Sequence, residues 1–235
     1  MAKRKPRWKS TPNLAAAFSV AQLAHNTQSR KNDTCDPYIS HLMAVAALVI
    51  EHGGTESQAI VALLHDTIED TNVKYEALRE LFGSRIANGV RECSDTEVET
   101  GKDKGPYGPR KTAYLVHLAS AHPSDLTFLV KLADKTHNCE ATARVWSREK
   151  HKTVSEFWKP FNSGDSCQET WYRSLALALT HVAKKQQMNE QHQLLLNRFN
   201  TAVSTLFDGR KTEKCTRDHE HLPAIDTIKR LISAA

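Results

Sequence analysis

Apolar residues recur at intervals of three and four along most of the chain, and few segments alternate as a half-buried strand would. This spacing places apolar side chains on one face of a helix, so it predicts an all-α protein built as an orthogonal helical bundle. The expected helices span residues 13–27, 38–52, 55–67, 73–82, 84–93, 110–121, 125–138, 139–150, 167–186, 189–207 and 222–233.

Short polar residues and glycines mark several of the expected helix ends. Thr55 and Ser84 stand where N-caps belong, because their hydroxyls can accept hydrogen bonds from the first free backbone amides. Gly53-Gly54 and Gly83 stand where helices should stop, because glycine adopts the backbone angles that end a helix. These residues therefore divide the first half of the chain into separate helices.

Two segments interrupt the helical pattern. Residues 95–109 and 159–167 are rich in glycine, proline and charged residues, which predicts loops that either cover a site or serve as solvated connections. After residue 187 the chain becomes polar and then offers two more helices. We therefore expect one large domain over residues 1–186 and a C-terminal helical extension over residues 187–235, packed on it.

The composition is that of an ordinary globular protein, with 40% hydrophobic and 25% charged residues. The net charge of +5 suits an anionic substrate and does not require nucleic acid. No apolar run is long enough to span a membrane, and Ser19 and Gln22 interrupt the run that follows the basic start, which favours an amphipathic first helix over a signal peptide. We therefore expect a cytoplasmic protein without a membrane or nucleic-acid partner.

The cysteines predict neither disulfides nor a metal site. They are scattered, odd in number, and show no CxxC pair and no spacing typical of zinc ligands: Cys35, Cys93, Cys139, Cys167 and Cys215. Such a set is typical of reduced thiols in the cytosol.

Ionisable residues interrupt three otherwise apolar segments, YISHLMAVAALVI, IVALLHDTIED and LTFLVKLADKTHN. A buried charge without a partner is costly, so such groups are usually paired or bound to metal. The residues concerned are His41, His65, Asp66, Glu69, Asp70 and Asp134. We expect two imidazoles and two carboxylates to form one metal site, with the Glu69-Asp70 pair beside it.

The adjacent His65 and Asp66 impose a condition on this site. Their side chains would diverge by about 100° on a regular helix, so they can share one ion only if the helix ends or distorts there. Imidazole and carboxylate ligands suit Mn²⁺ or Fe²⁺ rather than a structural zinc ion. Taken singly, each residue has a simpler explanation, such as a core histidine or a solvated helix end, and the prediction depends on their joint occurrence.

The predicted site indicates hydrolytic chemistry. A divalent cation lowers the pKa of a bound water molecule and neutralises phosphate oxygens. One residue of the Glu69-Asp70 pair could orient or deprotonate the attacking water, and the other could hold a second water or protonate the leaving group. The sequence does not divide these roles between the two.

Four segments resemble the HD hydrolase domain of the RelA/SpoT superfamily, and most closely its stand-alone small alarmone hydrolases. They are SRKND…DPYISH (29–41), VALLHDTIEDT (61–71), FGSRIANGV (82–90) and VKLADKTHN (130–138), and together they frame residues 13–185, about three quarters of the chain. The combination of HDxxED with KLADKxxN is far more specific than the HD dipeptide alone. The resemblance implies Mn²⁺-dependent removal of pyrophosphate from the 3′ position of guanosine tetra- or pentaphosphate.

The resemblance also implies roles for individual residues. His41, His65, Asp66 and Asp134 would hold the metal, and Glu69 and Asp70 would carry out hydrolysis. Arg30, Lys31, Lys131 and Asn138 would contact the nucleotide, and His137 is either a core residue or a contact. An arginine plane can stack on a purine while lysine neutralises phosphate.

Further phosphate contacts are expected from two helices. Arg110 and Lys111 begin a helix directly after the first predicted loop. The segment ETWYRSLALAL resembles the aromatic-rich helix that closes the family's site, so Tyr172 or Arg173 could reach a phosphate while Trp171 packs in the core.

Other functions compete with this interpretation. The substrate could be another purine nucleotide, such as an adenosine alarmone or NADPH, because stacking does not read base edges. A non-catalytic nucleotide-binding module on the same scaffold should have lost ligands or the second carboxylate pair, and this chain keeps both. We expect no synthetase activity, since 235 residues leave no room for that domain, and a monomer or weak homo-oligomer.

Overall fold

A computed structural model describes residues 6–31, 35–94, 105–149, 153–161 and 163–235. The all-α prediction is confirmed, since these residues contain helices and no strand beyond an isolated bridge between Ser29 and Pro37. The first helices are α1 (Pro12–Ala24), α2 (Ile39–Glu51), α3 (Glu56–Leu64), α4 (Thr67–Asp70), α5 (Tyr75–Phe82) and α6 (Ser84–Cys93). They are followed by α7 (Tyr107–Ser120), α8 (Phe128–Arg148), α9 (Val154–Trp158), α10 (Asp165–Lys185), α11 (Glu190–Phe207) and α12 (Ile225–Ala234).

Several of the expected helix boundaries in the first half of the chain are present, but the helix predicted over residues 55–67 ends at Leu64 and a second helix, α4, begins at Thr67. The Thr55 hydroxyl accepts from the Gln58 amide in a capping box that starts α3. Gly53 and Gly83, with φ of 93° and 83°, follow the ends of α2 and α5. The N-cap predicted at Ser84 is wrong: α6 begins at Ser84 itself, Gly83 occupies the cap position, and no side chain caps the helix.

The second half of the chain departs from the predicted boundaries. The two helices predicted over residues 125–138 and 139–150 are instead the single helix α8, Phe128–Arg148, which contains neither proline nor glycine and keeps one buried face through Cys139 and Ala143. α7 begins at Tyr107, before the predicted residue 110, and α9 lies between two helices where none was predicted. The loop predicted over residues 95–109 lies mostly outside the described residues.

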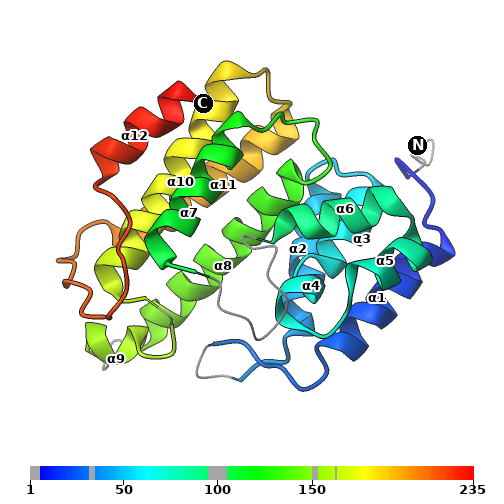
Figure 1. Cartoon of the computed structure of the whole chain (residues 1–235), viewed down its shortest axis with the longest axis horizontal. Helices are drawn as coiled ribbons and strands as arrows, with labels where there is room; N and C mark the ends of the chain where they lie inside the picture. The colour runs from blue at the N-terminus through cyan, green and yellow to red at the C-terminus, as the bar shows by residue number, and fades with distance from the viewer. Residues whose placement is uncertain (1–5, 32–34, 95–104, 150–152, 162) are drawn as a thin grey trace, which may run out of the picture.

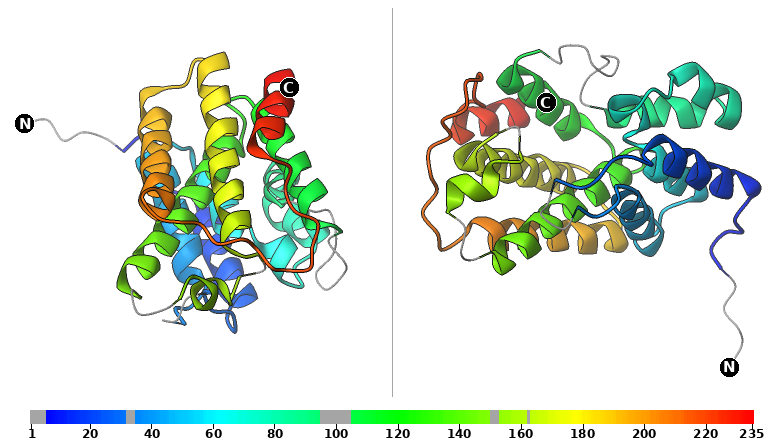
Figure 2. Two further views of the ribbon diagram at one scale, coloured as in Figure 1. Left: turned by 90° about the vertical axis from the view of Figure 1, so that its left-hand side faces the viewer. Right: turned by 90° about the horizontal axis from the view of Figure 1, so that it is seen from below.

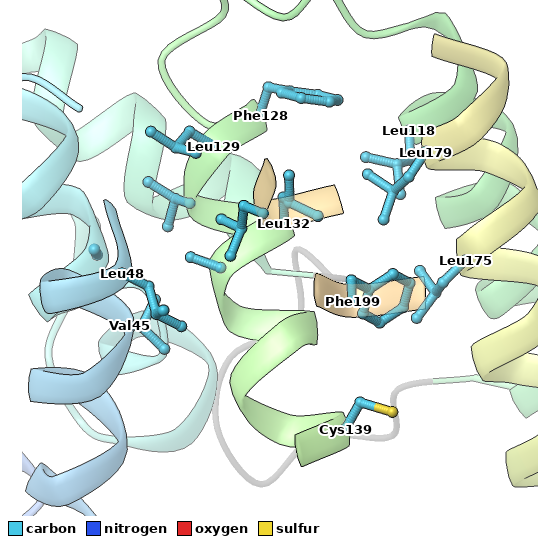
Figure 3. Close-up of a cluster of buried hydrophobic side chains, with 14 of the residues drawn as sticks. Val45, Leu48, Leu118, Phe128, Leu129, Leu132, Cys139, Leu175, Leu179 and Phe199 are labelled. Carbon is cyan, nitrogen blue, oxygen red and sulfur yellow. The ribbon is translucent and has the colours of Figure 1, made fainter. Parts of the chain in front are cut away.

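α8 runs through the middle of the molecule, between α1–α6 on one side and α7 and α10–α12 on the other (Figure 1). Apolar side chains fill the space on both of its faces. Val45 and Leu48 of α2 approach Leu132 from one side, and Leu175 of α10 and Phe199 of α11 lie on the other (Figure 3). These side chains are all at most 5% exposed, so α8 is held on both sides by close packing.

The chain after residue 187 contributes α11 and α12, as predicted. α11 packs on α8 and α10, and α12 packs on α10 and α7. Residues 208–224, which we call the C-terminal strap, connect these helices without a helix or strand of their own and run along the outside of the bundle (Figure 2). The division into two domains at residue 186 stays a prediction. Among the described residues, no helix is both long and apolar enough to cross a membrane.

Candidate functional site

The helix before His65 ends at the position that a shared ion at His65 and Asp66 requires. α3 stops at Leu64 and α4 starts at Thr67, so His65 and Asp66 lie in the break between two helices. The Thr67 hydroxyl donates to the Leu64 carbonyl at 2.5 Å and holds the chain in this turn. As a result, His65 Nε2 lies 3.0 Å from Asp66 Oδ2, although the two residues are adjacent in sequence.

Two more donors reach this break from α2 and α8. His41 Nε2 lies 3.6 Å from Asp66 Oδ2 and 3.2 Å from Asp134 Oδ1. His65 Nε2 lies 3.6 Å from the same Asp134 oxygen. The structure therefore brings together His41, His65, Asp66 and Asp134 from three places in the chain, and we call this group the HD centre.

The HD centre could hold a divalent cation. Both imidazoles are buried, at 0% and 3% exposure, yet neither His41 Nε2 nor His65 Nε2 has a hydrogen-bond partner. A buried nitrogen without a partner is unfavourable, and a cation would accept its lone pair. His65 Nδ1 lies 2.8 Å from the Ala62 carbonyl, to which it can only donate, so Nε2 is the nitrogen left to bind a cation. Two imidazoles and two carboxylates suit Mn²⁺ or Fe²⁺.

His137 orients the other imidazole. His137 Nδ1 lies 2.8 Å from His41 Nδ1, so one nitrogen must donate and the other accept. Burial, together with the nearby His41 and Arg30, lowers the pKa of His137 to about 3, so its ring is neutral and can accept. Burial lowers the pKa of His41 to about 4, so this ring is neutral too and either ring can donate the hydrogen bond; when a cation binds His41 Nε2, the His41 proton lies on Nδ1 and is donated to His137. His137 is a contact of the centre rather than only a core residue.

The two carboxylates are also fixed by hydrogen bonds. The Tyr38 hydroxyl donates to Asp66 Oδ2 at 2.6 Å, and burial followed by the charge of Asp66 raises the pKa of Tyr38 well above 10, which keeps this donor protonated. Lys135 Nζ lies 2.7 Å from Asp134 Oδ2, and Asn138 donates to Asp134 Oδ1 at 2.5 Å. Metal ligands are commonly oriented by such partners.

Sequence reasoning did not identify Tyr38 or Lys135. Two signals were available: Tyr38 precedes His41 by about one helical turn, and Lys135 directly follows Asp134. Both residues also line the cleft that lies beside the HD centre.

The groups of the HD centre shift one another's pKa values. Burial disfavours a charge on each group, but the Asp66 and Asp134 carboxylates raise the pKa of His65 well above 6.5. In turn His65 holds the pKa of Asp66 below its usual range, and Lys135 with the two imidazoles does the same for Asp134, in both cases against burial. Burial is the main reason why the pKa of His41 falls to about 4. The raised pKa of His65 favours its protonated form, and a cation that binds through Nε2 must displace that proton.

A cleft of about 580 Å³ opens beside the HD centre. Tyr38, Lys135 and Asn138, which hydrogen-bond the two carboxylates, line this cleft, whereas the four residues of the HD centre do not, so the HD centre lies directly behind these side chains. Charged groups from α4 and the chain before α2 line the cleft together with apolar and aromatic groups from α8–α10. Residues predicted for the site that line the cleft are Arg30, Lys31, Glu69, Asp70, Lys111, Asn138 and Tyr172.

A chain of hydrogen bonds links the rim of the cleft to the HD centre. Arg30 donates to Asn138 Oδ1 at 2.6 Å, and Asn138 donates to Asp134. The Arg30 guanidinium also lies 5.6 Å from the ring centre of Tyr38. Since Tyr38 donates to Asp66, Arg30 is connected to both carboxylates through one intermediate residue each.

Other predicted contacts lie elsewhere. Lys131 is buried, with its ammonium 6.0 Å from the Tyr114 ring, and neither Lys131 nor Arg110 lines the cleft. Arg173 pairs with Glu169 and Asp208.

Trp171, which we expected to pack only in the core, lines the cleft with Tyr172. Lys111 Nζ lies 4.4 Å from its ring centre, a cation–π geometry that fixes both side chains in the wall.

Comparison with known proteins places these features in a family context. A family model described as "HD domain" matches residues 17–162. The chain is 35% identical over 152 residues to guanosine-3′,5′-bis(diphosphate) 3′-pyrophosphohydrolase MESH1 of Xenopus tropicalis, a match that covers 62% of this chain and 79% of the relative. It is also 35% identical over 144 residues to the bifunctional (p)ppGpp synthase/hydrolase SpoT of Escherichia coli, which covers 61% of this chain but 20% of that longer protein.

Solved structures share the fold. A metazoan orthologue of SpoT, reported to hydrolyse ppGpp, superposes with a TM-score of 0.63 and 21% identity, covering 85% of this chain and 99% of the other. The Listeria monocytogenes protein lmo0812 superposes with a TM-score of 0.55 and 20% identity, covering 70% and 96%.

We expect replacement of His137 by alanine to weaken Mn²⁺ binding by about 10- to 100-fold, because His41 loses the partner that fixes its tautomer and ring orientation. Calorimetric titration with Mn²⁺ measures the affinity. His117→Ala is the matched control, since that imidazole is exposed on α7. Equal affinity in the two variants would contradict the orienting role.

We also expect the affinity for Mn²⁺ to fall as the pH falls. The pKa of His65 is raised, so below it the cation must displace one proton, and the affinity should decrease by about tenfold per pH unit. Titrations across pH, in two buffers of different ionisation enthalpy, measure both the affinity and the proton release. An affinity that does not change with pH, with no proton released, would contradict the assigned charge of His65.

Proposed function

This chain belongs to the HD domain family, and we propose that it hydrolyses guanosine 3′,5′-bis(diphosphate) and the corresponding pentaphosphate, releasing pyrophosphate and leaving GDP or GTP. The observation that carries the proposal is the convergence of four donor groups directly behind the wall of a cleft that basic side chains line. Relatives named for this reaction match the chain over most of their own length.

We propose that His41, His65, Asp66 and Asp134 hold Mn²⁺. The two unpartnered Nε2 atoms and the two carboxylates are nitrogen and oxygen donors, and the HD centre contains no thiolate. Bound there, the cation would acidify water and neutralise charge on the scissile phosphate. Tyr38, Lys135 and His137 keep the donors in place through the hydrogen bonds described above.

Glu69 and Asp70 are proposed to handle protons during hydrolysis. Both lie on α4, directly after the HD centre, and both line the cleft. The Gln28 amide donates to the Asp70 carbonyl at 2.6 Å and fixes the end of this short helix. One carboxylate would orient and deprotonate the attacking water, and the other would act on the leaving 3′ oxygen. Because they are adjacent, only separate substitutions can divide these roles.

The lining of the cleft suits both parts of the substrate. Lys31, Lys111 and Lys135 line the cleft and can neutralise the phosphates. Arg30 can stack on the purine, and Tyr172 with Trp171 forms the opposite wall. We propose that the enzyme works in the cytoplasm as a monomer or weak homo-oligomer, without nucleic acid. Lys131 and Arg110 would contact the substrate only after a movement that brings them to the cleft.

A product analysis tests the function. Incubation of the purified protein and Mn²⁺ with guanosine tetraphosphate should yield GDP and pyrophosphate, separated by anion-exchange chromatography. Parallel reactions with the adenosine analogue and with NADPH show whether the cleft selects the base or the nucleotide type. If the 3′-pyrophosphate stays intact while Mn²⁺ is bound, the proposed function fails.

Two substitutions separate the roles of the site. Glu69→Gln should keep bound Mn²⁺ but lower kcat by a factor of roughly 10²–10⁴, because it removes a proton-transfer group without removing a ligand. Asp134→Ala should abolish Mn²⁺ binding and activity together. Glu80→Gln, on an exposed face of α5, is the control. Normal turnover by Glu69→Gln would exclude Glu69 from the chemistry.

A further inference from the structure

A second group of metal-ligating side chains lies outside the cleft, where the C-terminal strap meets the first turn of α10. Cys167, Cys215, His219 and His221 each place one donor atom within 4.8 Å of all the others. Cys167 Sγ lies 3.0 Å from His221 Nδ1 and 3.4 Å from His219 Nε2, and Cys215 Sγ lies 3.8 Å from the same His219 nitrogen.

These three separations, 3.0, 3.4 and 3.8 Å, are close to those of a tetrahedral zinc site. Zn²⁺ binds thiolate sulfur at about 2.3 Å and imidazole nitrogen at about 2.0–2.1 Å, so neighbouring ligands around one ion stand about 3.3–3.8 Å apart. Both cysteines are free, and each is 4% exposed. Two thiols and two imidazoles gathered around one point, with the thiols buried, form the set that structural zinc sites use.

The surrounding backbone holds this arrangement in place. The Gly164 amide donates to Cys215 Sγ at 3.2 Å, and the Cys215 amide donates to the Ser166 hydroxyl at 2.9 Å. Hydrogen bonds to a thiolate sulfur are typical of the second layer around a metal. At Gly164 an added Cβ would stand 3.1 Å from that sulfur, so glycine allows the close approach.

The start of α7 fixes the histidines. The Tyr107 ring stacks on His219 with ring centres 4.8 Å apart. The Gly108 amide donates to the Glu220 carbonyl, between the two histidines, at 2.9 Å. An added Cβ at Gly108 would stand 2.2 Å from the His221 carbonyl, so only glycine allows the strap to lie this close to α7.

We propose that Cys167, Cys215, His219 and His221 bind a structural Zn²⁺ ion, distinct from the metal of the HD centre. All four ligands come from the protein, so the site is closed and leaves no position for a substrate. On binding, each thiol loses its proton to solvent and each imidazole binds through the nitrogen that faces the cluster. Thiolates favour Zn²⁺, whereas the carboxylates of the HD centre favour Mn²⁺, so the two sites select different ions.

The ion would fasten the strap to the helix that carries the wall of the cleft. The strap buries few apolar residues, chiefly Leu222, so hydrophobic packing alone secures it weakly. Cys167 is followed by Gln168, and one turn later by Trp171 and Tyr172, all of which line the cleft. The zinc site therefore holds this end of α10, together with the start of α7 that precedes Lys111.

From the sequence alone we expected no metal site at the cysteines, because they show no spacing typical of zinc ligands. Cys215 and the two histidines follow C-x₃-H-x-H, and the fourth ligand is 48 residues away on another helix (215 − 167). The spacing is unlike that of common zinc modules. The folded arrangement rather than the motif identifies the site.

Metal analysis of the purified protein tests the proposal. We expect about one zinc ion per chain that remains in Asp134→Ala, where the HD centre has lost a ligand. In that background Cys215→Ser and His221→Ala should each lose most of the zinc, whereas Cys35→Ser, at an exposed cysteine, should keep it. His221 is exposed, so its replacement leaves the packing intact even if a cysteine variant folds poorly.

A spectrum provides a second measurement on the unaltered cluster. Co²⁺ bound in place of zinc should give sulfur-to-cobalt charge-transfer bands and the intense visible bands of a tetrahedral ion, and both should disappear in His221→Ala. The melting temperature of the wild-type protein should fall when zinc is removed. Absence of zinc in the Asp134→Ala background, zinc retained in Cys215→Ser, or a Cys167–Cys215 disulfide in the intact mass of freshly purified protein would each overturn the proposal.

Discussion

The site depends on the break in the backbone between α3 and α4. Two consecutive residues can point at one place only where a helix is interrupted, and the helical structure is interrupted between Leu64 and Thr67. His65 and Asp66 occupy this turn, while His41 and Asp134 are brought to it by helices that pack on α3. Placing these polar groups in the core is tolerable because each is held by a partner or can share an ion.

Much of the architecture could be predicted because helical periodicity and polar interruptions are local signals. The apolar runs around His41, His65 and Asp134 indicated helices that carry polar groups into a core, and the structure brings these three side chains together. The adjacency of His65 and Asp66 even required a helix end at one position, which is present. The motif resemblance added the family, and the comparisons agree with it.

Features that depend on packing between distant segments could not be predicted from local sequence patterns. Periodicity could not show that Lys131 is buried while Lys135 lines the cleft. Both residues lie on α8, and the packing of neighbouring helices decides which face of α8 points to the cleft. Trp171 is a wall of the cleft although its helix face is mostly core. The cluster at Cys167 joins the first turn of α10 to the strap that follows α11, and no local spacing in the sequence reveals that these segments meet. α9 is too short for a periodic signal.

α8 is both the centre of the core and the source of Asp134. A change in its packing that shifts the helix by a fraction of an ångström would displace this carboxylate as well, so tolerance to mutation and catalytic competence cannot be separated there. α7, α9 and α10 contribute cleft walls without contributing a donor to the HD centre. Laboratory evolution toward a different nucleotide should therefore accumulate its accepted substitutions on those three helices and leave α8 almost unaltered.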